Sequence, residues 1–371
     1  MHLLVFAAYY SPHRGGYELY AEELASRLVH MGHQVTVVTS NSERSPVQET
    51  LRGVTVFRWP CWNILGGTFP IPKPGRQYFQ LAAYMHREHV DLINTQTRFF
   101  LTSFFGWWFA KTQGLPLVHT EHGTRFVELS SWWTRLISRI YDQILGRLVI
   151  SSADRIIASS RAAGEFTRKL GGKTFDLVYN GVDTSTFFSD NSQHQSTTQR
   201  LLFVGRLIAA KGVQELIQSF SDIQKKFPQS QLTIIGTGNY EQQLKILADR
   251  NTNIEFLQKL TVSELRLQYQ QAQVFINPSF SEGLPTSVLE AIACGSKVAA
   301  TDVGGTKEIV EQLHIPASQM IVIPPHDKQQ LIDSVCRLLS DTSSTPIDMA
   351  PFSWQRSAEN FVGLLQQTLA T

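Results

Sequence analysis

Cysteine is scarce in this 371-residue chain, and its scarcity excludes two classes of protein. Cys61, Cys294 and Cys336 are widely separated and include no Cys-x-x-Cys pair, so they predict neither a disulfide framework nor a zinc site. An odd, dispersed set of this kind is typical of a reducing compartment. We therefore expect a cytoplasmic protein.

Long apolar runs are also absent. No segment approaches the roughly 18 consecutive apolar residues that suggest a membrane-spanning helix. The apolar start Leu3–Ala8 has neither a basic leader nor a cleavage site, so it predicts a buried first strand rather than a signal peptide. We expect the chain to be soluble, or at most peripheral at the inner face of a membrane.

Charge is sparse as well, at 17% of residues and a formal net charge of +2. Its distribution is uneven, because the residues up to Asn180 include 19 basic and 13 acidic side chains, whereas the remainder include 14 and 18. The basic excess of the first part suits anionic lipid headgroups or phosphorylated acceptors. It is too small and too dispersed for nucleic acid, which we do not expect as a partner.

The chain does have enough apolar content, 42% of its residues, to fill two hydrophobic cores. Short apolar or β-branched runs alternate with longer amphipathic stretches, which predicts buried parallel strands separated by helices. The predicted fold class is α/β, with two doubly wound Rossmann-like domains. The predicted strands are His2–Ala8, Gln34–Thr39, Val54–Trp59, Leu92–Thr95, Leu117–Thr120 and Arg155–Ser159, followed by Leu201–Val204, Gln231–Ile235, Ile254–Leu257, Val274–Asn277, Lys297–Thr301 and Met320–Ile323.

The polar stretch Ser189–Gln199 has too little apolar content to be a helix or a strand. We place the connection between the domains just before it. This gives an N-terminal domain over residues 1–183 and a C-terminal domain over residues 184–353. A last helix over residues 354–371 has no following strand to pair with, and whether it packs back on the N-terminal domain is left open.

Ligands of open α/β sheets bind beyond the carboxyl ends of the strands, so the loops that follow strands are informative. Gly15-Gly16 follows the first strand and opens a helix, where backbone amides can meet an anion, although a simple tight connection also explains paired glycines. In the second half, Arg206 follows a strand and Lys211 precedes the next helix. Either cation alone would indicate a solvated surface group, but two around one loop favour a diphosphate clamp.

Gly236 and Gly238 follow the second strand of the C-terminal half and look like part of a dinucleotide fingerprint. The third glycine of that fingerprint is missing, because Glu241 occupies its position. The pair therefore does not favour a nicotinamide site. Close approach of the backbone to another ligand stays open.

The most specific motif is the segment Ser279–Ala291, which follows a predicted strand. Pro285 suits the first position of a helix, where a helix N-terminus favours phosphate. Glu282 and Glu290 could accept hydrogen bonds from sugar and ribose hydroxyls of one ligand. Taken singly, Glu282 would be a helix cap and Glu290 a satisfied helix residue. The amides expected around the anion belong to Gly283, Leu284, Thr286 and Ser287.

These motifs together resemble the retaining glycosyltransferases of family 4, which have the GT-B fold, and the resemblance covers nearly the whole chain. Further matching segments are Gly15-Gly16 with Glu18, Thr120–Gly123, Asn180–Asp183 and Gly304–Glu308. One departure is Lys297, where the family commonly has a proline before a strand.

The resemblance implies two groups of site residues and no cofactor, since the nucleotide sugar is a substrate. The implied reaction-centre and phosphate groups are His122, Arg206, Lys211 and Glu282. The implied donor-binding residues are Gly15, Gly16, Gly236, Gly238, Gly283, Leu284, Pro285, Thr286 and Glu290, with Glu290 on the ribose. His122 is expected to position the sugar and to stabilise charge.

The resemblance further implies transfer of a sugar from a UDP- or GDP-sugar to a glycan or lipid-linked acceptor, with retention of configuration. No acidic residue is marked as a covalent nucleophile, so we expect same-face attack assisted by the leaving diphosphate. No Asp-x-Asp pair occurs, which favours a metal-independent reaction and no metal ligands. Two alternatives stay open: a nucleotide-sugar epimerase of the same fold, and a non-catalytic nucleotide-sugar binding protein.

A helix predicted over Trp132–Leu148 is relevant to whether the acceptor is linked to a lipid. Trp132, Leu136, Ile140, Ile144 and Leu148 share one face, and Arg135 and Arg139 lie on another. Such a pattern resembles an interfacial helix that contacts an anionic membrane. The commoner interpretation, which we prefer from the pattern alone, is a helix whose apolar face packs on the domain's own sheet.

Overall fold

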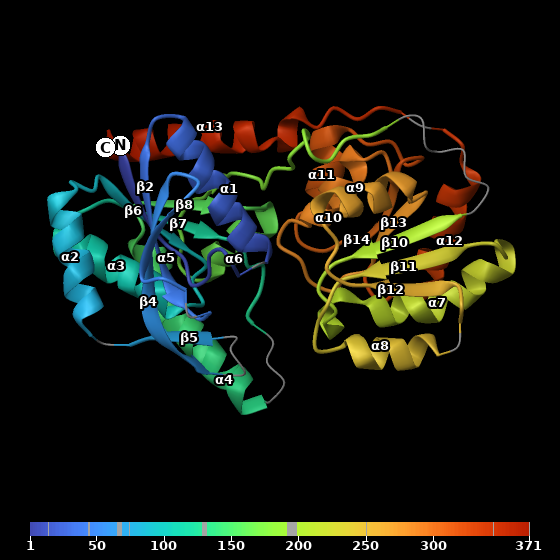
Figure 1. Cartoon of the computed structure of the whole chain (residues 1–371), viewed down its shortest axis with the longest axis horizontal. Coiled ribbons are helices and arrows are strands. Elements are labelled where there is room, and N and C mark those ends of the chain that lie inside the picture. Colours follow the sequence, from blue (N-terminus) through green and yellow to red (C-terminus); the bar gives the residue numbers. More distant parts are fainter. Residues whose placement is uncertain are drawn as a thin grey trace. The chain divides into compact units, whose positions relative to one another are not determined.

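The computed structural model describes all residues except 14, 44, 65–68, 74, 128–131, 191–198, 250, 344 and 371. Most of the predicted polar connection Ser189–Gln199 therefore lies outside the described residues. The chain forms two compact units, coloured along the sequence in Figure 1. Unit 1 comprises Met1–Asn180 and Trp354–Thr371, and unit 2 comprises Gly181–Ser353.

Unit 1 contains a sheet with the strand order β3-β4-β2-β1-β6-β7-β8-β9, and β5 pairs with β4. All neighbours are parallel except β3 and β5, which pair antiparallel with β4. The strands are β1 (His2–Phe6), β2 (Gln34–Asn41), β3 (Gln48–Leu51), β4 (Val54–Ile64), β5 (Phe69–Pro72), β6 (Leu92–Gln96), β7 (Leu117–Glu121), β8 (Arg155–Ala158) and β9 (Asp176–Leu177).

Helices cover both faces of this sheet (Figure 1). Successive side chains of β1 point to opposite faces, and each face packs against helices. Leu3 and Val5 pack in the cluster that holds α1 and α13, whereas Leu4 and Phe6 pack with residues of α2 and α3. The C-terminal helix thus belongs to the core of unit 1. The helices are α1 (Gly16–His30), α2 (Arg76–Arg87), α3 (Leu101–Gln113), α4 (Trp132–Tyr141), the π-helical turn η2 (Asp142–Gly146), α5 (Arg147–Ser152), α6 (Arg161–Lys169) and α13 (Trp354–Leu369).

Unit 2 has a fully parallel sheet in the order β12-β11-β10-β13-β14-β15. Its core on one face joins β10 and β11 to α7, α8 and α12. The strands are β10 (Arg200–Val204), β11 (Gln231–Ile235), β12 (Ile254–Leu257), β13 (Val274–Asn277), β14 (Lys297–Thr301) and β15 (Met320–Ile323). The helices are the 3-10 turns η3 (Ala209–Lys211) and η4 (Ala350–Phe352), and α7 (Val213–Lys226), α8 (Glu241–Ala248), α9 (Val262–Gln271), α10 (Thr286–Ala293), α11 (Thr306–Leu313) and α12 (Lys328–Ser340).

Both units have the doubly wound order in which the first strand of the unit lies at the centre of the sheet, so the predicted architecture is confirmed. In unit 2 the winding direction reverses between β10 and β13, and in unit 1 between β1 and β6. A crevice for ligands forms at such a switch point, beyond the carboxyl ends of the strands. The loops after β1, β6, β10 and β13 are therefore where the functional groups are expected.

Candidate functional site

The two switch-point loops of unit 2 lie directly against each other. The amide of Phe280, after β13, donates to the carbonyl of Ala210, after β10, at 2.8 Å. Gly212 has φ 68°, and a Cβ there would lie 1.9 Å from the carbonyl oxygen of Pro278. Only glycine fits this position, since it combines a left-handed backbone with a backbone contact on its open side. This contact fixes the position of the backbone at the preceding residue, Lys211.

Lys211 and Glu282 form an ion pair across these loops. Lys211 Nζ lies 2.6 Å from Glu282 Oε1, and both side chains are mostly buried. The hydroxyl of Ser279 lies 2.6 Å from the same carboxylate oxygen. The structure thus brings together a cation and a carboxylate that are 71 residues apart in the sequence. Glu282 lies outside α10 and contacts Lys211, so it is not a helix cap.

The start of α10 presents amides next to this pair. The helix begins at Thr286, and Pro285 is its N-cap residue, one position earlier than the first helical position expected for it. Within the described residues, the amides of Gly283, Leu284, Thr286 and Ser287 donate no hydrogen bond. Unsatisfied amides at a helix start are a site for an anion.

The loop after β14 packs against the loop that precedes α10. The amide of Gly305 donates to the carbonyl of Gly283 at 2.7 Å, and a Cβ on Gly304 would lie 2.3 Å from that oxygen. The Gly304-Gly305 pair therefore supports the segment that carries Glu282.

Arg206 differs from Lys211 in its surroundings. Its side chain is exposed, and it has no ion-pair partner among the described residues. The guanidinium is thus available to an anionic ligand.

Gly236 and Gly238 have a packing role in the structure. A Cβ on Gly236 would lie 1.9 Å from the carbonyl oxygen of Gly205, and one on Gly238 would lie 2.1 Å from that of Leu207. The amide of Leu207 also donates to the carbonyl of Thr237 at 2.9 Å. Both glycines let the loop after β11 lie against the loop after β10, which explains their presence without a ligand.

Glu290 lies inside α10 and accepts a hydrogen bond from the hydroxyl of Tyr269 at 2.7 Å. Burial raises the pKa of Glu290 to about 7, although the hydrogen bond from Tyr269 lowers it. A glutamate so placed holds a proton over part of the physiological range. The hydrogen bond from Tyr269 agrees in part with the interpretation of Glu290 as a helix residue whose carboxylate already has a partner.

In unit 1, the paired glycines open α1, with Gly15 as the N-cap residue. The carboxylate of Glu18 lies against Gly15, since a Cβ there would be 2.3 Å from Glu18 Oε2. Glu18 is almost fully buried and lies 3.2 Å from His13 Nδ1. The N-terminus of a helix favours negative charge, and the carboxylate of Glu18 already supplies that charge at the start of α1. Gly16 has open space on its Cβ side.

His122 follows β7 and is held by a chain of hydrogen bonds that begins at a backbone carbonyl. Asn94 Nδ2 donates to the carbonyl of Val118 at 3.1 Å, Gln96 Nε2 donates to Asn94 Oδ1 at 2.6 Å, and Gln96 Oε1 lies 2.8 Å from His122 Nε2. Because a carbonyl can only accept, each amide has one orientation, and His122 Nε2 must carry the proton. Nδ1 of His122 is therefore the acceptor of the ring.

Burial lowers the pKa of His122 to about 4, despite the nearby charge of Glu121. The ring is neutral at pH 7, so the charge-stabilising role expected for His122 is not supported by its surroundings. The ring of Tyr20 packs against it with 4.7 Å between centroids. His122 is thus a fixed, neutral hydrogen-bonding group.

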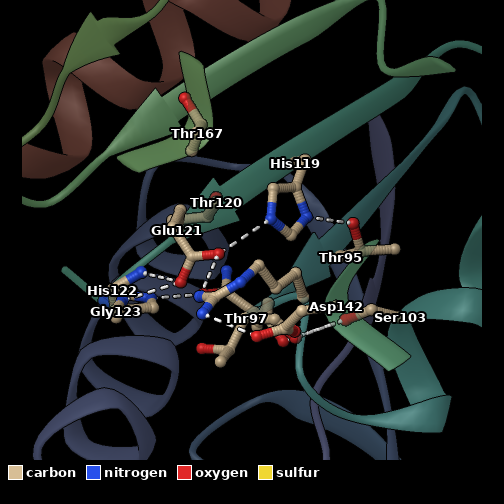
Figure 2. A network of polar contacts seen from close by, with 12 residues as sticks. Thr95, Thr97, Ser103, His119, Thr120, Glu121, His122, Gly123, Asp142 and Thr167 are labelled. Carbon is tan, nitrogen blue, oxygen red and sulfur yellow. Dashed lines mark hydrogen bonds and ion pairs between the residues drawn. The ribbon is translucent and has the colours of Figure 1, made fainter. Parts of the chain in front are cut away.

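Glu121 organises the loop that contains His122. Its Oε1 accepts from the amides of His122 at 2.9 Å and Gly123 at 2.7 Å, and its Oε2 lies 3.0 Å from Arg98 Nη1. Figure 2 shows these contacts together with His119, whose Nε2 is 3.5 Å from Glu121 Oε2. Burial acts to raise the pKa of Glu121, but the charge of Arg98 and the surrounding donors hold it well below its usual range. The carboxylate stays ionised.

Arg98 joins Glu121 to the helical segment after α4. Its side chain is 1% exposed, and Nη2 contacts Asp142 Oδ2 at 3.2 Å and the carbonyl of Arg125 at 3.0 Å. Burial raises the pKa of Asp142 to about 6, although Arg98 lowers it. A Cβ on Gly123 would lie 2.9 Å from Arg98 Nη1, so Gly123 leaves room for the guanidinium. This network is the largest buried charge cluster that we find in the described part of unit 1.

Arg98, Asp142, Ser279 and Tyr269 were not among the candidates predicted from the sequence. Arg98 and Asp142 are 44 residues apart, and Tyr269 and Glu290 are 21 apart, so no local spacing links them. The position of Arg98 just after β6, at the switch point of unit 1, was the one available signal.

Two family descriptions match consecutive parts of the chain. Residues 14–186 match Glycosyltransferase Family 4, and residues 185–350 match Glycosyl transferases group 1. D-inositol 3-phosphate glycosyltransferase of Pseudarthrobacter chlorophenolicus is 30% identical over 326 residues, which cover 80% of this chain and 76% of that protein.

Solved structures share the fold over the full length. Sucrose-phosphate synthase of Thermosynechococcus elongatus aligns with a TM-score of 0.80 at 21% identity, covering 100% of this chain and 99% of the other. The HepE protein of Anabaena in complex with UDP-glucose aligns with a TM-score of 0.70 at 19% identity, covering 99% and 98%. The chain therefore belongs to the family 4, group 1 glycosyltransferases, and it is a glycosyltransferase with the GT-B fold.

Proposed function

We propose that this enzyme transfers a sugar from a UDP- or GDP-sugar to a glycan or lipid-linked acceptor, with retention of configuration and without a metal ion. The observation that carries the proposal is the Lys211–Glu282 pair, 2.6 Å apart, at the switch point of unit 2 beside the amides that open α10. Cations and amides there suit a diphosphate, and the carboxylate suits sugar hydroxyls.

In the proposed reaction, the bond between the anomeric carbon and the diphosphate oxygen breaks as the acceptor oxygen bonds to the same face of that carbon. The acceptor proton passes to the leaving diphosphate. Lys211, Arg206 and the amides of α10 stabilise the charge that grows on the leaving group, which is usually the largest contribution to catalysis. Within unit 1, Nδ1 of His122 is an acceptor suited to a hydrogen bond from a substrate hydroxyl. Glu282 holds the sugar, and Glu290 holds the ribose.

The nucleotide can be identified by differential scanning fluorimetry with UDP-, GDP- and ADP-sugars, since a ligand that binds only the folded state raises its melting temperature. Support for UDP comes from the fold neighbour solved with UDP-glucose. Incubation with the donor alone then separates the alternatives: an epimerase converts the donor to a stereoisomer. A non-catalytic binding protein leaves the donor intact even when acceptor is present.

We expect the transfer rate to be unchanged by EDTA, because Arg206, Lys211 and the α10 amides supply the positive charge that a metal otherwise provides at a diphosphate. The measurement is product formation by the dialysed enzyme with EDTA, and with added Mg²⁺ or Mn²⁺. Loss of activity in EDTA that either cation restores would contradict the metal-independent mechanism.

We also expect donor binding to release a proton between about pH 6 and 7, where Glu290 titrates. A raised pKa means that the free protein holds the proton below this range, and ribose hydroxyls that donate to the carboxylate favour its ionised form. Affinity should therefore increase as the pH rises through this window. Calorimetry with a nucleotide sugar in buffers of different ionisation enthalpy measures the release.

The matched variants for this test are Glu290→Gln and Glu241→Gln; Glu241 begins α8 and pairs with Lys245. Glu290→Gln should bind without proton release, and Glu241→Gln should behave as the wild type. Proton release that persists in Glu290→Gln would remove Glu290 from the ribose site.

A further inference from the structure

The helical segment α4–η2 exposes its large apolar residues and buries its small and polar ones. The exposed side chains are half to three-quarters accessible: Trp132, Trp133, Leu136, Ile137, Ile140 and Ile144. They cover one arc of roughly 140° at 100° per residue, and we call them the α4 apolar face. The prediction that this helix packs its apolar face on its own sheet is therefore wrong.

The opposite side of the segment faces the domain. Ser138, Asp142 and Gly146 are buried there at four-residue intervals. Apart from η2, no helix or strand in the described part of the chain packs extensively along α4, which projects at the lower edge of unit 1 in Figure 1. Small side chains on this side bring the backbone close to the domain and leave the bulky side chains pointing outward.

A buried charge fixes this orientation. Asp142 is bonded to Arg98, which is itself bonded to Glu121 (Figure 2). Rotating the segment to bury its apolar face would separate Asp142 from Arg98 and leave the carboxylate without its cation. A contiguous apolar surface held outward in this way is rare on a soluble monomer and indicates an interaction site.

The charges of the segment identify the partner. From the start of α4 to the end of α5, Trp132–Ser152, there are three arginines, all exposed: Arg135, Arg139 and Arg147. The one acidic residue in this range is the buried Asp142. The exposed surface is thus cationic and apolar, with tryptophans at one end. Arginines next to an apolar helical face, with tryptophan in the headgroup region, match a bilayer that carries anionic lipids. A protein groove would be expected to place carboxylates opposite these arginines.

We propose that the α4 apolar face inserts into the surface of an anionic lipid bilayer, with Arg135 and Arg139 at the headgroups. In Figure 1 no helix or strand of unit 1 is drawn beyond α4 on that edge. The site residues of the proposed function take no part in this contact, so binding is measured without turnover.

The test is cosedimentation of the full chain with vesicles of phosphatidylcholine alone and of phosphatidylcholine with one-quarter phosphatidylglycerol. The wild type should bind the anionic vesicles at least about tenfold more tightly, since each arginine near such a surface contributes about 1 kcal/mol. Leu136→Glu/Ile140→Glu should weaken that binding by about tenfold or more, because it places two carboxylates in the inserted face. Arg135→Glu/Arg139→Glu should weaken it similarly, and only for anionic vesicles.

Matched controls separate this effect from general changes of charge or polarity. Ile246 is equally exposed on α8 of unit 2, so Ile246→Glu should leave binding unchanged. Arg87→Glu/Lys111→Glu, with the same change of net charge on other helices of unit 1, should retain most of the binding. All substituted side chains are exposed, so each variant is expected to melt as the wild type does.

Three results would overturn the proposal. The wild type fails to bind anionic vesicles, the α4 variants bind as well as the wild type, or light scattering shows a dimer that Leu136→Glu/Ile140→Glu converts to monomer. The last result would assign the face to a second copy of the chain.

Discussion

Replacing Arg98 by methionine should lower the free energy of unfolding of unit 1 by about 3–5 kcal/mol, the cost of breaking a buried ion pair from one side. Arg98 is 1% exposed and contacts two carboxylates, Glu121 at 3.0 Å and Asp142 at 3.2 Å. Methionine has a similar length but no charge, so both carboxylates would stay buried without their cation. For a unit of this size the melting temperature should fall by on the order of 10 °C.

The pH dependence of this effect is a stricter test than its size. Burial raises the pKa of Asp142 to about 6 even with Arg98 present, and removing Arg98 raises that pKa further. A raised folded-state pKa means that stability is present at low pH and lost as the pH rises through it. The destabilisation by Arg98→Met should therefore be smaller at about pH 5 than at about pH 8. Thermal or urea unfolding at both values measures it.

A compensated variant provides the control. Arg98→Met/Glu121→Gln/Asp142→Asn removes all three charges, so it should recover part of the lost stability, because neutral side chains of similar shape cost less to bury. The exposed Arg87, which pairs with Glu88, gives the surface comparison: Arg87→Met should change stability by less than about 1 kcal/mol. An Arg98→Met protein as stable as the wild type at pH 8 would show that the network is not a structural element.

The Arg98 network also shows where prediction from sequence stops. The strands of unit 2 were predicted within one residue of their observed bounds, because strands buried on both faces are continuous apolar runs between turns. The short β3, β5 and β9 were missed. β3 and β5 are antiparallel to β4, and β3 is partly exposed, so neither forms such a run; β9 comprises only Asp176 and Leu177.

The Lys211–Glu282 pair could be anticipated because each residue follows a strand on one side of the same switch point, and topology brings those loops together. Side-chain partners were not predictable in the same way. Glu121 was visible only as a member of the Thr120–Gly123 motif, and its contacts with Arg98 depend on tertiary packing.

The α4 segment illustrates a different limit. The 3.6-residue pattern showed that the helix has an apolar face, but periodicity does not tell which face meets the domain. Ser138, Asp142 and Gly146 on the other side were the available clue, because small side chains allow close packing. Asp142 shows which side of the helix faces the domain, but only once Arg98 is known to be its buried partner.

Lys211→Ala should reduce kcat by about 10²–10³, the usual loss when one preorganised donor to a developing charge is removed. The ammonium group is held in place by the 2.6 Å contact with Glu282 and by Gly212, whose left-handed backbone ends the turn Ala209–Lys211. A cation fixed in advance loses no reorganisation energy when negative charge grows on the leaving diphosphate. KM should change less than kcat, since the charge to be stabilised is greater in the transition state than in the donor.

Glu282→Gln should also reduce kcat, both by weakening its contact with sugar hydroxyls and by releasing Lys211. Because the two residues contact each other, the losses should not add: Lys211→Ala/Glu282→Gln should be less impaired than the product of the single effects. Lys245, which is 49% exposed on α8 and pairs with Glu241, is the matched control, and Lys245→Ala should retain wild-type kinetics. Steady-state rates with saturating donor, together with a melting curve of each variant, separate loss of catalysis from loss of folding.

The double variant distinguishes a catalytic pair from two independent ligands of the donor. Independent groups would give additive free-energy losses, and a purely structural pair would lower the melting temperature of unit 2 in step with kcat. A kcat for Lys211→Ala within about threefold of the wild type, in a protein that melts normally, would contradict the role of Lys211. Catalysis would then have to depend on Arg206 and the amides that open α10, the remaining groups at this switch point that can stabilise a diphosphate.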